Sequence, residues 1–360
     1  MAQDVFFAPL IEDPAAFAEP DLRPGLQALG RARGLPGGVP GSWAMKVHLG
    51  PRNRPSAVDA AWATAVGEIL AGTGRNAFAF DTLSITTEGL DEAVAHQELA
   101  YVKGFGNGDL PYVVADGPEQ GPSLSTNNLA DSGLADHTLA GGLAAARNLC
   151  VLTPIRPHPH VGLRGAITTM GVGLADRASK IALHENIRPK VDTPLCAGCG
   201  VCMTVCLFDA IKLSAGRAFI DHKLCTGCGE CMNVCFMAGI NPAEEEGVPA
   251  FQAKVADAAL AARDRLTDGE SARPVYFNFL VRLDRQGGGA RSRQREHLGN
   301  IGILASRDPV ALDQATFEMI SGRMGGNLGD WSGFKQLPEA LLARAEAIGL
   351  GETAYNLVTV

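Results

Sequence analysis

The residues with the clearest chemistry in this sequence are its cysteines. Eight of the nine lie in one short window, between Cys196 and Cys235. They form two C-x₂-C-x₂-C-x₃-C runs, and the segment 195–206 recurs at 224–235. A disulfide framework would be spread along a small secreted chain, so this local concentration of thiols indicates metal ligation.

The spacing of each run is typical of a ligand loop around an iron–sulfur cubane. Three cysteines with two-residue gaps wrap one cluster, and the fourth cysteine of the run reaches the other cluster. We therefore predict two [4Fe–4S] clusters as cofactors. Structural zinc is the alternative, but a zinc site needs only four ligands, usually from two C-x₂-C pairs. The first predicted ligand set is Cys196, Cys199, Cys202 and Cys235, and the second is Cys225, Cys228, Cys231 and Cys206.

This segment resembles the bacterial two-cluster ferredoxins over residues 191–245. The proline that usually follows the fourth cysteine is Leu207 in one run and Phe236 in the other, and this departure removes no ligand. Glycines at 198, 200, 227 and 229 suit loops whose amides turn toward sulfur. A ferredoxin accounts for only a small part of the 360 residues, so an electron carrier is not the whole protein.

Composition narrows the class of protein further. With 46% hydrophobic and 19% charged residues the chain is globular. A net charge of −8 argues against nucleic acid as a partner, because phosphate binding requires a basic surface. No apolar run is long enough to cross a membrane. The acidic N-terminal segment is unlike a signal peptide, so we expect a cytoplasmic protein.

Cys150, in an apolar strand, is predicted to be a buried structural thiol.

Outside the cysteine segment, predicted strands alternate with predicted helices, whereas the first 35 residues show little strand signal. The expected fold class is α/β: a mostly parallel sheet flanked by helices, with an inserted ferredoxin-like two-cluster domain. The alternation on both sides of the cysteines divides the chain into 1–190, 191–245 and 246–360, where the outer parts form one domain. Three consecutive units are the alternative. Predicted strands cover 44–50, 77–81, 112–116, 149–153, 275–283 and 301–305, and predicted helices cover 56–70, 91–102, 134–147, 251–266, 308–320 and 338–348.

Charged and imidazole side chains gather at the predicted carboxyl ends of the strands. In open α/β sheets this edge forms the ligand crevice. Each residue alone also has an ordinary structural interpretation, as a cap or a turn, but together they favour a site. We predict proton donors at His48, His158 and His160, with His48 and His158 in one pocket that a cluster faces. An anionic substrate would be held by Lys46, Asp81, Arg156, Arg164 and Lys180.

A glycine-rich stretch at 165–173 leads into a predicted helix. Such a loop either cradles an anion or forms a structural turn, and both interpretations stay open. It lacks the Gly-Lys-Ser/Thr ending of a Walker A loop, and it is a poor dinucleotide fingerprint.

The order of several motifs resembles the family called domain of unknown function 362, over about residues 44–350. The matching elements are Lys-Val-His-Leu-Gly at 46–50, His158, the glycines of 165–173, Lys180, His184, and the segments 302–306 and 308–315. The resemblance implies a ferredoxin insert after the Lys180-to-His184 stretch and suggests a redox role. This chain departs from it at Arg156, at Thr168-Thr169, and after Leu283, where a Cys-Asp-Cys element is missing. Chemistry that relies on those groups is therefore in doubt.

These features predict an iron–sulfur oxidoreductase. Its clusters would pass electrons from an external donor, such as ferredoxin or flavodoxin, to a small anionic substrate in the α/β crevice. The alternative is a redox-sensing or electron-delivery protein that docks a partner and has no substrate chemistry. A third hypothesis is a single metal ion held by His48, His158 and His160.

Overall fold

The three-dimensional structure is a computed structural model of the chain. It describes residues 2–10, 20–32, 35, 41–50, 58–71, 77–86, 89–108, 110–126, 134, 137–242, 247–267, 274–283, 298–325, 328 and 336–360. Every residue predicted for the ligand sets and the crevice lies in these ranges. The Asp284–Gly287 segment, where the family's Cys-Asp-Cys element is missing, lies outside them.

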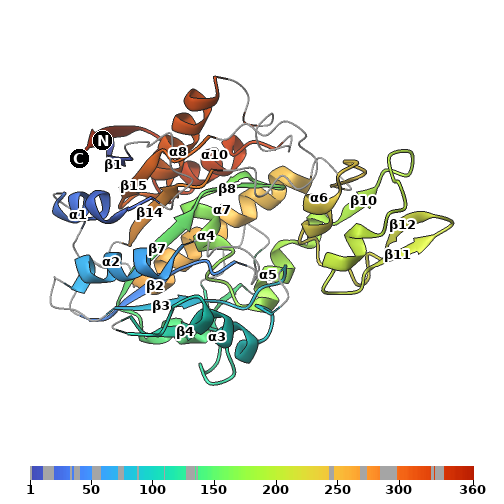
Figure 1. Ribbon diagram of the computed structural model, residues 1–360, viewed down its shortest axis with the longest axis horizontal. Helices are drawn as coiled ribbons and strands as arrows, with labels where there is room; N and C mark the ends of the chain where they lie inside the picture. Colours follow the sequence, from blue (N-terminus) through green and yellow to red (C-terminus); the bar gives the residue numbers. More distant parts are fainter. Residues whose placement is uncertain are drawn as a thin grey trace.

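The body of the protein is built on one eight-stranded sheet, of order β16-β1-β15-β14-β7-β2-β3-β4 (Figure 1). Strands β14, β7, β2, β3 and β4 run parallel to one another, whereas β15 is antiparallel to both of its neighbours. The sheet is thus mostly parallel, as predicted. The strands are β1 Gln3–Pro9, β2 Trp43–Lys46, β3 Ala77–Asp81, β4 Tyr112–Val114, β7 Asn148–Pro154, β14 Val275–Leu280, β15 Gly302–Ser306 and β16 Tyr355–Thr359.

The central strands are apolar on both faces because helices cover both faces. Along β2, Trp43 and Met45 pack into one core, whereas Ala44 packs into the other. This alternation follows from the two-residue period of a strand. Cys150 lies wholly buried in β7, as predicted, and burial raises the pKa of its thiol.

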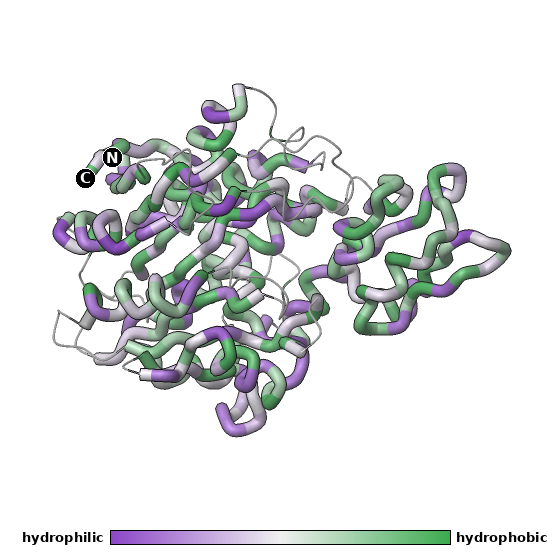
Figure 2. The backbone as a smooth tube through the Cα atoms, viewed as in Figure 1, coloured by the Kyte–Doolittle hydropathy of each residue, from purple (hydrophilic) through white to green (hydrophobic). Residues whose placement is uncertain are grey.

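Among the described residues, helices cover both faces of the sheet (Figures 1 and 2). The core on one face takes side chains from α1 Arg23–Arg31, α2 Ala60–Ala71 and α3 Ala93–Val102. The core on the other face takes them from α4 Ala166–Gly171, α7 Gly247–Thr267, α8 Pro309–Met324 and α10 Glu339–Ala347. A shorter helix, α5 Arg177–Leu183, leads from this layer toward the cysteines. No helix among the described residues is both long and apolar enough to cross a membrane.

Residues 189–242, here called the cysteine module, project from one end of the α/β body (Figure 1). The module has a small core of its own, in which Cys202 and Cys231 pack with Ile211, Ile220 and Ile240. The large sheet contains strands from before the module in the sequence, such as β2 and β7, and strands from after it, namely β14, β15 and β16. Its elements are β10 Pro189–Val191, η3 Val201–Val205, β11 Ile211–Ser214, β12 Arg217–Ile220, α6 Glu230–Val234 and β13 Ile240–Pro242.

The structure corrects two predictions about local elements. The predicted helix over 134–147 is absent from the described part of that range, which holds the short strand β6 Thr138–Leu139 and the 3₁₀ turn η1 Gly141–Ala145. Gly141 lies so close to the carbonyl oxygens of Gly121 and Pro122 that no side chain fits there. The N-terminal segment forms β1, which pairs with β15 and β16. Its strand character depends on those distant partners.

Candidate functional site: two cysteine pockets and an adjoining crevice

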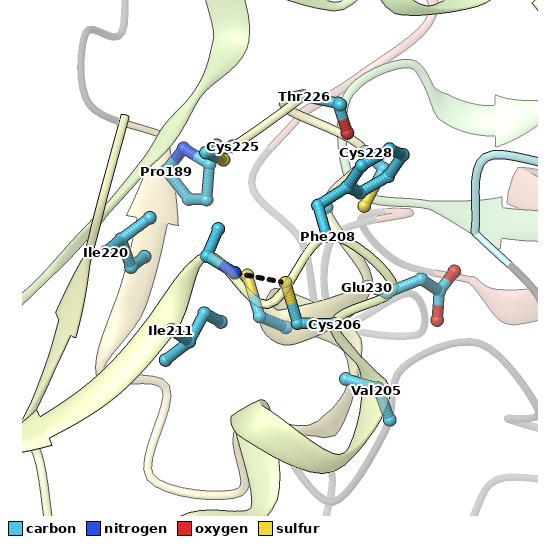
Figure 3. A pocket seen from close by; sticks show the side chains of 13 residues that line it. Pro189, Val205, Cys206, Phe208, Ile211, Ile220, Cys225, Thr226, Cys228 and Glu230 are labelled. Atoms are coloured by element: carbon cyan, nitrogen blue, oxygen red, sulfur yellow. Dashed lines mark hydrogen bonds between the residues drawn. The ribbon is translucent and has the colours of Figure 1, made fainter. Parts of the chain in front are cut away.

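Two pockets in the cysteine module are each lined by four cysteines, and in each case one cysteine comes from the other sequence run. The first pocket is lined by Cys196, Cys199, Cys202 and Cys235. The second is lined by Cys206, Cys225, Cys228 and Cys231, with Ile211 and Ile220 beside them (Figure 3). Each pocket is lined by the four cysteines of one predicted set, and the binding of a cluster by them stays a prediction.

The two halves of the module repeat each other in detail. The backbone N–H of Ala210 donates to Cys206 Sγ at 3.4 Å, and that of Gly239 donates to Cys235 Sγ at 3.3 Å. Cys196 Sγ accepts a further N–H, from Ala218, at 3.4 Å. Amide donors to sulfur stabilise thiolate ligands and tune the potential of a bound cluster.

The two hollows between the cysteines contain about 340 and 380 Å³ of empty space, a volume that includes their open mouths. Among the described residues, no three His, Cys, Asp or Glu side chains converge closely enough to share one metal ion. This finding argues against a single metal held by His48, His158 and His160.

The first pocket opens on an apolar surface of the module. Cys199 is exposed, whereas Cys202 and Cys231 are buried. The surrounding side chains, here called the apolar rim, are 37–45% exposed. The rim consists of Val201, Met203, Leu213, Phe236 and Met237.

The second pocket faces the α/β body instead. Its ligand loop carries Gly227 and Gly229 with φ of 78° and 81°, in the left-handed region that favours glycine. A Cβ at Gly227 would overlap the carbonyl oxygen of His184, and one at Gly229 would lie 2.6 Å from His160 Nε2. These two glycines let the second ligand loop pack directly on the histidines of the body.

Three histidines lie together at this contact, and we call them the histidine cluster: His158, His160 and His184. The ring of His160 lies 5.9 Å from that of His158 and 6.4 Å from that of His184, measured between centroids. His158 Nδ1 accepts backbone N–H groups at 3.3 and 3.4 Å, so its proton is on Nε2. His184 Nδ1 donates to the Lys180 carbonyl at 2.7 Å. Burial lowers the pKa of His160 to about 3 and that of His184 to about 4, so these rings are neutral at pH 7.

Lys46 and Asp81, both predicted to bind substrate, form a buried ion pair at the carboxyl ends of β2 and β3. Lys46 Nζ donates to Asp81 Oδ1 at 2.5 Å, and Asp81 also accepts the backbone N–H groups of Leu49 and Thr82. Burial alone would raise the pKa of Asp81, but the neighbouring Lys46 ammonium outweighs it and the pKa is lowered. The pair therefore holds the ends of two strands together.

Lys180 extends this charged network from α5. Its Nζ donates to Thr82 Oγ1 at 2.6 Å and to the Leu83 carbonyl at 2.5 Å. Burial lowers the pKa of Lys180 to about 8, and the ammonium of Lys46 adds to the shift. Lys180 is thus bound to the body of the protein and is close to half neutral at pH 8.

His48 and Arg164 are the predicted residues that the structure leaves available to a ligand. Both are partly exposed, and within the described part of the chain neither side chain makes a hydrogen bond. Burial, followed by the charge of Arg164, lowers the pKa of His48 and also that of His158, so the guanidinium lies near both imidazoles. Arg156 lies near His48 too, and it donates to the carbonyls of Ile155 and Val281.

Arg164 also connects this crevice to the cysteine module. Burial lowers its pKa, and the charge of Glu230 is the strongest opposing influence. Glu230 begins α6 and lines the second pocket. Glu230 thus lies near the Arg164 guanidinium and also lines the second cysteine pocket, so it connects the two. The sequence did not mark Glu230 as a candidate site residue. Its position directly before Cys231 was the signal that could have identified it.

Within the glycine-rich stretch at 165–173, residues 166–171 form the short helix α4, and Gly165 is its N-cap. Asp313, from α8, accepts the backbone N–H groups of Ala166 at 2.7 Å and Ile167 at 2.9 Å. Asn278 donates to the same carboxylate at 2.8 Å. Burial raises the pKa of Asp313 to about 6. An internal carboxylate therefore occupies the position that an external anion would take.

Replacing Asp313 is expected to destabilise the body of the protein. Asp313→Ala leaves the N–H groups of Ala166 and Ile167 buried without acceptors, so we expect a loss of about 2–3 kcal/mol of unfolding free energy. Urea denaturation followed by circular dichroism measures it. Asp264→Ala, at an exposed ion pair, is the matched control and is expected to change stability by less than about 0.5 kcal/mol. Equal stability of the two variants would contradict the assigned role of Asp313.

The fold and site define an α/β protein with a mostly parallel sheet, carrying a module with two cysteine-lined pockets that lies against histidines and charged side chains of the body. The chain belongs to the DUF362 family, a domain of unknown function, whose match covers residues 44–318.

Other comparisons are distant. No curated protein matches the sequence. Among solved structures, the lactate racemase apoprotein from Thermoanaerobacterium thermosaccharolyticum has a TM-score of 0.43 and 14% identity; the match covers 89% of this chain and 57% of that one. A Thermotoga maritima protein has a TM-score of 0.38 and 10% identity, covering 78% and 54%. This chain thus spans little more than half the length of either structure, and no activity follows from the likeness.

Proposed function

We propose that this protein is an iron–sulfur oxidoreductase that reduces a small anionic substrate in the crevice between the sheet edge and the cysteine module. The observation that carries the proposal is the grouping of the eight cysteines into two four-thiol pockets, the second of which lies against the histidines of the α/β body. Each set would hold a [4Fe–4S] cluster, which supplies single electrons when bound. This module resembles the bacterial two-cluster ferredoxins in its cysteine spacing.

Arg164 and His48 are the residues best suited to bind the substrate. A guanidinium without a hydrogen-bond partner favours a carboxylate or phosphate, which it can bind with two parallel hydrogen bonds. An anion beside Arg164 would offset its charge and so raise the lowered pKa of His48. His48 would then give a proton to the substrate as the substrate gains electrons, and its partial exposure allows solvent to restore that proton. His160, being wholly buried, is less suited to this role.

The first cysteine set is the better entry point for electrons. Its pocket opens at the apolar rim, whereas the second pocket faces the histidine cluster. We assign the rim to a small one-electron carrier protein, such as a ferredoxin or flavodoxin, which loses one electron at each encounter. An apolar rim excludes water from such a contact.

A reoxidation experiment tests this function. Protein reduced with dithionite under argon, then freed of reductant, is mixed with single carboxylates and phosphates while visible absorbance is recorded. Return of the oxidised spectrum with one compound, with loss of that response in Arg164→Ala, supports a reductase. Reoxidation by carrier proteins alone would instead support the electron-delivery alternative.

A charge placed on the rim is expected to slow electron entry. Val201→Glu puts a carboxylate into the apolar contact, and we expect reduction by a carrier protein to slow about tenfold, which corresponds to about 1.4 kcal/mol. Stopped-flow absorbance with reduced flavodoxin measures the rate. Leu357→Glu, at a side chain that is 47% exposed against 40% for Val201 but lies on β16 of the body, is the control. Reduction by dithionite should be the same in both variants, and unchanged flavodoxin rates in Val201→Glu would contradict the assigned entry point.

A further inference from the structure

His160 is a buried side chain whose ring nitrogens lack a hydrogen-bond partner within the part of the chain that the structure describes. It is 0% exposed, and neither Nδ1 nor Nε2 has a hydrogen-bond partner of standard geometry among the described residues. Leaving a buried polar group unsatisfied costs about 1–3 kcal/mol. A buried polar group without a partner in a folded protein calls for an explanation. A hydrogen bond to a bound cofactor is one such explanation.

Three aromatic rings contact the imidazole of His160. They are those of His158, His184 and Phe251, with centroids between 5.6 and 6.4 Å away. None of these forms a hydrogen bond with its ring nitrogens. The Gln252 side chain donates to the His160 backbone carbonyl at 2.9 Å and so leaves the ring nitrogens unsatisfied.

The second ligand loop also lies against the imidazole of His160. His160 Nε2 points at Gly229, where an added Cβ would lie only 2.6 Å away, and Gly229 lines the second cysteine pocket with Cys228. The backbone of Gly227, in the same loop, lies close enough to raise the pKa of His160, although the contact lacks standard hydrogen-bond geometry. A residue larger than glycine at 229 would separate the imidazole from this loop.

We infer that His160 is a positioning residue, whose ring N–H donates a hydrogen bond to a sulfur atom of the cluster held by Cys206, Cys225, Cys228 and Cys231. This inference rests on the proposed function, because it requires the second cluster. A donor to sulfur stabilises the extra negative charge of the reduced state, so it raises the reduction potential of that cluster. The second cluster, which adjoins the crevice, would then attract electrons from the first.

Two variants of His160 separate this role from simple packing. His160→Phe keeps a ring of similar size but removes the donor, and His160→Gln keeps an N–H donor. His96→Phe is the matched control, because His96 is also 0% exposed and has an unpartnered Nδ1, on α3 of the body. Iron and sulfide are counted first in each anaerobic full-length protein. The two reduction steps are then followed by redox titration with electron paramagnetic resonance.

In His160→Phe we expect one of the two midpoint potentials to shift to a more negative value while the other stays in place. His160→Gln should recover part of the shift, and His96→Phe should show none. Unchanged potentials in an iron-replete His160→Phe protein would overturn the inference and leave the cluster assignment intact. Wild-type protein without iron and sulfide would overturn both.

A second measurement begins with the wild-type protein. Wild-type protein labelled with ¹⁵N-histidine is reduced and examined by pulsed electron–nuclear double resonance. A histidine nitrogen coupled to one reduced cluster supports the hydrogen bond, and its loss in His160→Gln or His160→Phe assigns it to His160 instead of His184. A spectrum without any histidine coupling would overturn the inference.

Discussion

Protein purified without oxygen is expected to contain about eight iron atoms and eight acid-labile sulfide ions per chain, four of each at either cysteine set. Cys206→Ala is expected to remove about four of each from the second set, although Cys206 belongs to the first sequence run. The reason is that Cys206 lines the pocket of Cys225, Cys228 and Cys231. Colorimetric iron and sulfide assays on the anaerobic protein measure the loss.

Double variants decide whether the ligation is crossed. Cys206→Ala combined with Cys228→Ala should lose no more iron than either single variant, because both affect one cluster. Cys206→Ala combined with Cys199→Ala should lose nearly all of the iron. Cys150→Ala, at a buried thiol in β7, is the control and should retain about eight iron atoms. The reverse pattern in the double variants would show that each run binds its own cluster, and two zinc ions without sulfide would reject both clusters.

Loss of His48 is expected to lower turnover of the substrate by roughly two to four orders of magnitude, the range for a missing general acid. His48 is partly exposed and near Arg164, so it can both reach a bound anion and respond to its charge. His48→Ala should change kcat with little change in KM, whereas Arg164→Ala should mainly raise KM. His158, which also faces Arg164, is expected to share part of this effect. Steady-state kinetics with the compound identified by reoxidation measure both constants.

Cluster content and folding provide the controls for these crevice variants. His48→Ala and Arg164→Ala should keep the iron content and thermal stability of the wild type, because neither side chain makes a hydrogen bond within the described residues. Arg31→Ala, which removes an exposed cation from the end of α1, should leave both kinetic constants unchanged. Turnover in His48→Ala within a factor of two of the wild type would remove His48 from the reaction.

Much of the iron–sulfur assignment follows from the sequence, because the ligands of one loop are only a few residues apart. The two-residue gaps between Cys225, Cys228 and Cys231 already define the loop that the structure contains. The parallel sheet was predicted on similar grounds, since each buried strand such as β3 or β7 is apolar over its own length. Local patterns of this kind do not depend on distant partners.

The distant contacts were decided only by tertiary structure. β1 is a strand because β15 and β16 lie beside it, more than 290 residues away along the chain. Asp313 fills the turn at Gly165 from another helix, and no local pattern around Gly165 reveals that carboxylate.

The same limit applies to the candidate site. The sequence alone identified His48, Arg164 and the cysteines as chemically capable groups. Folding decided that Lys46 and Asp81 neutralise each other, which leaves Arg164 available. It also placed His160 against the second ligand loop, where the imidazole fits because residue 229 is a glycine and has no Cβ. Residue types and spacing determine which chemistry a chain can perform, but charge pairing and burial depend on contacts between segments far apart in the sequence, so only the folded structure determines which groups remain available.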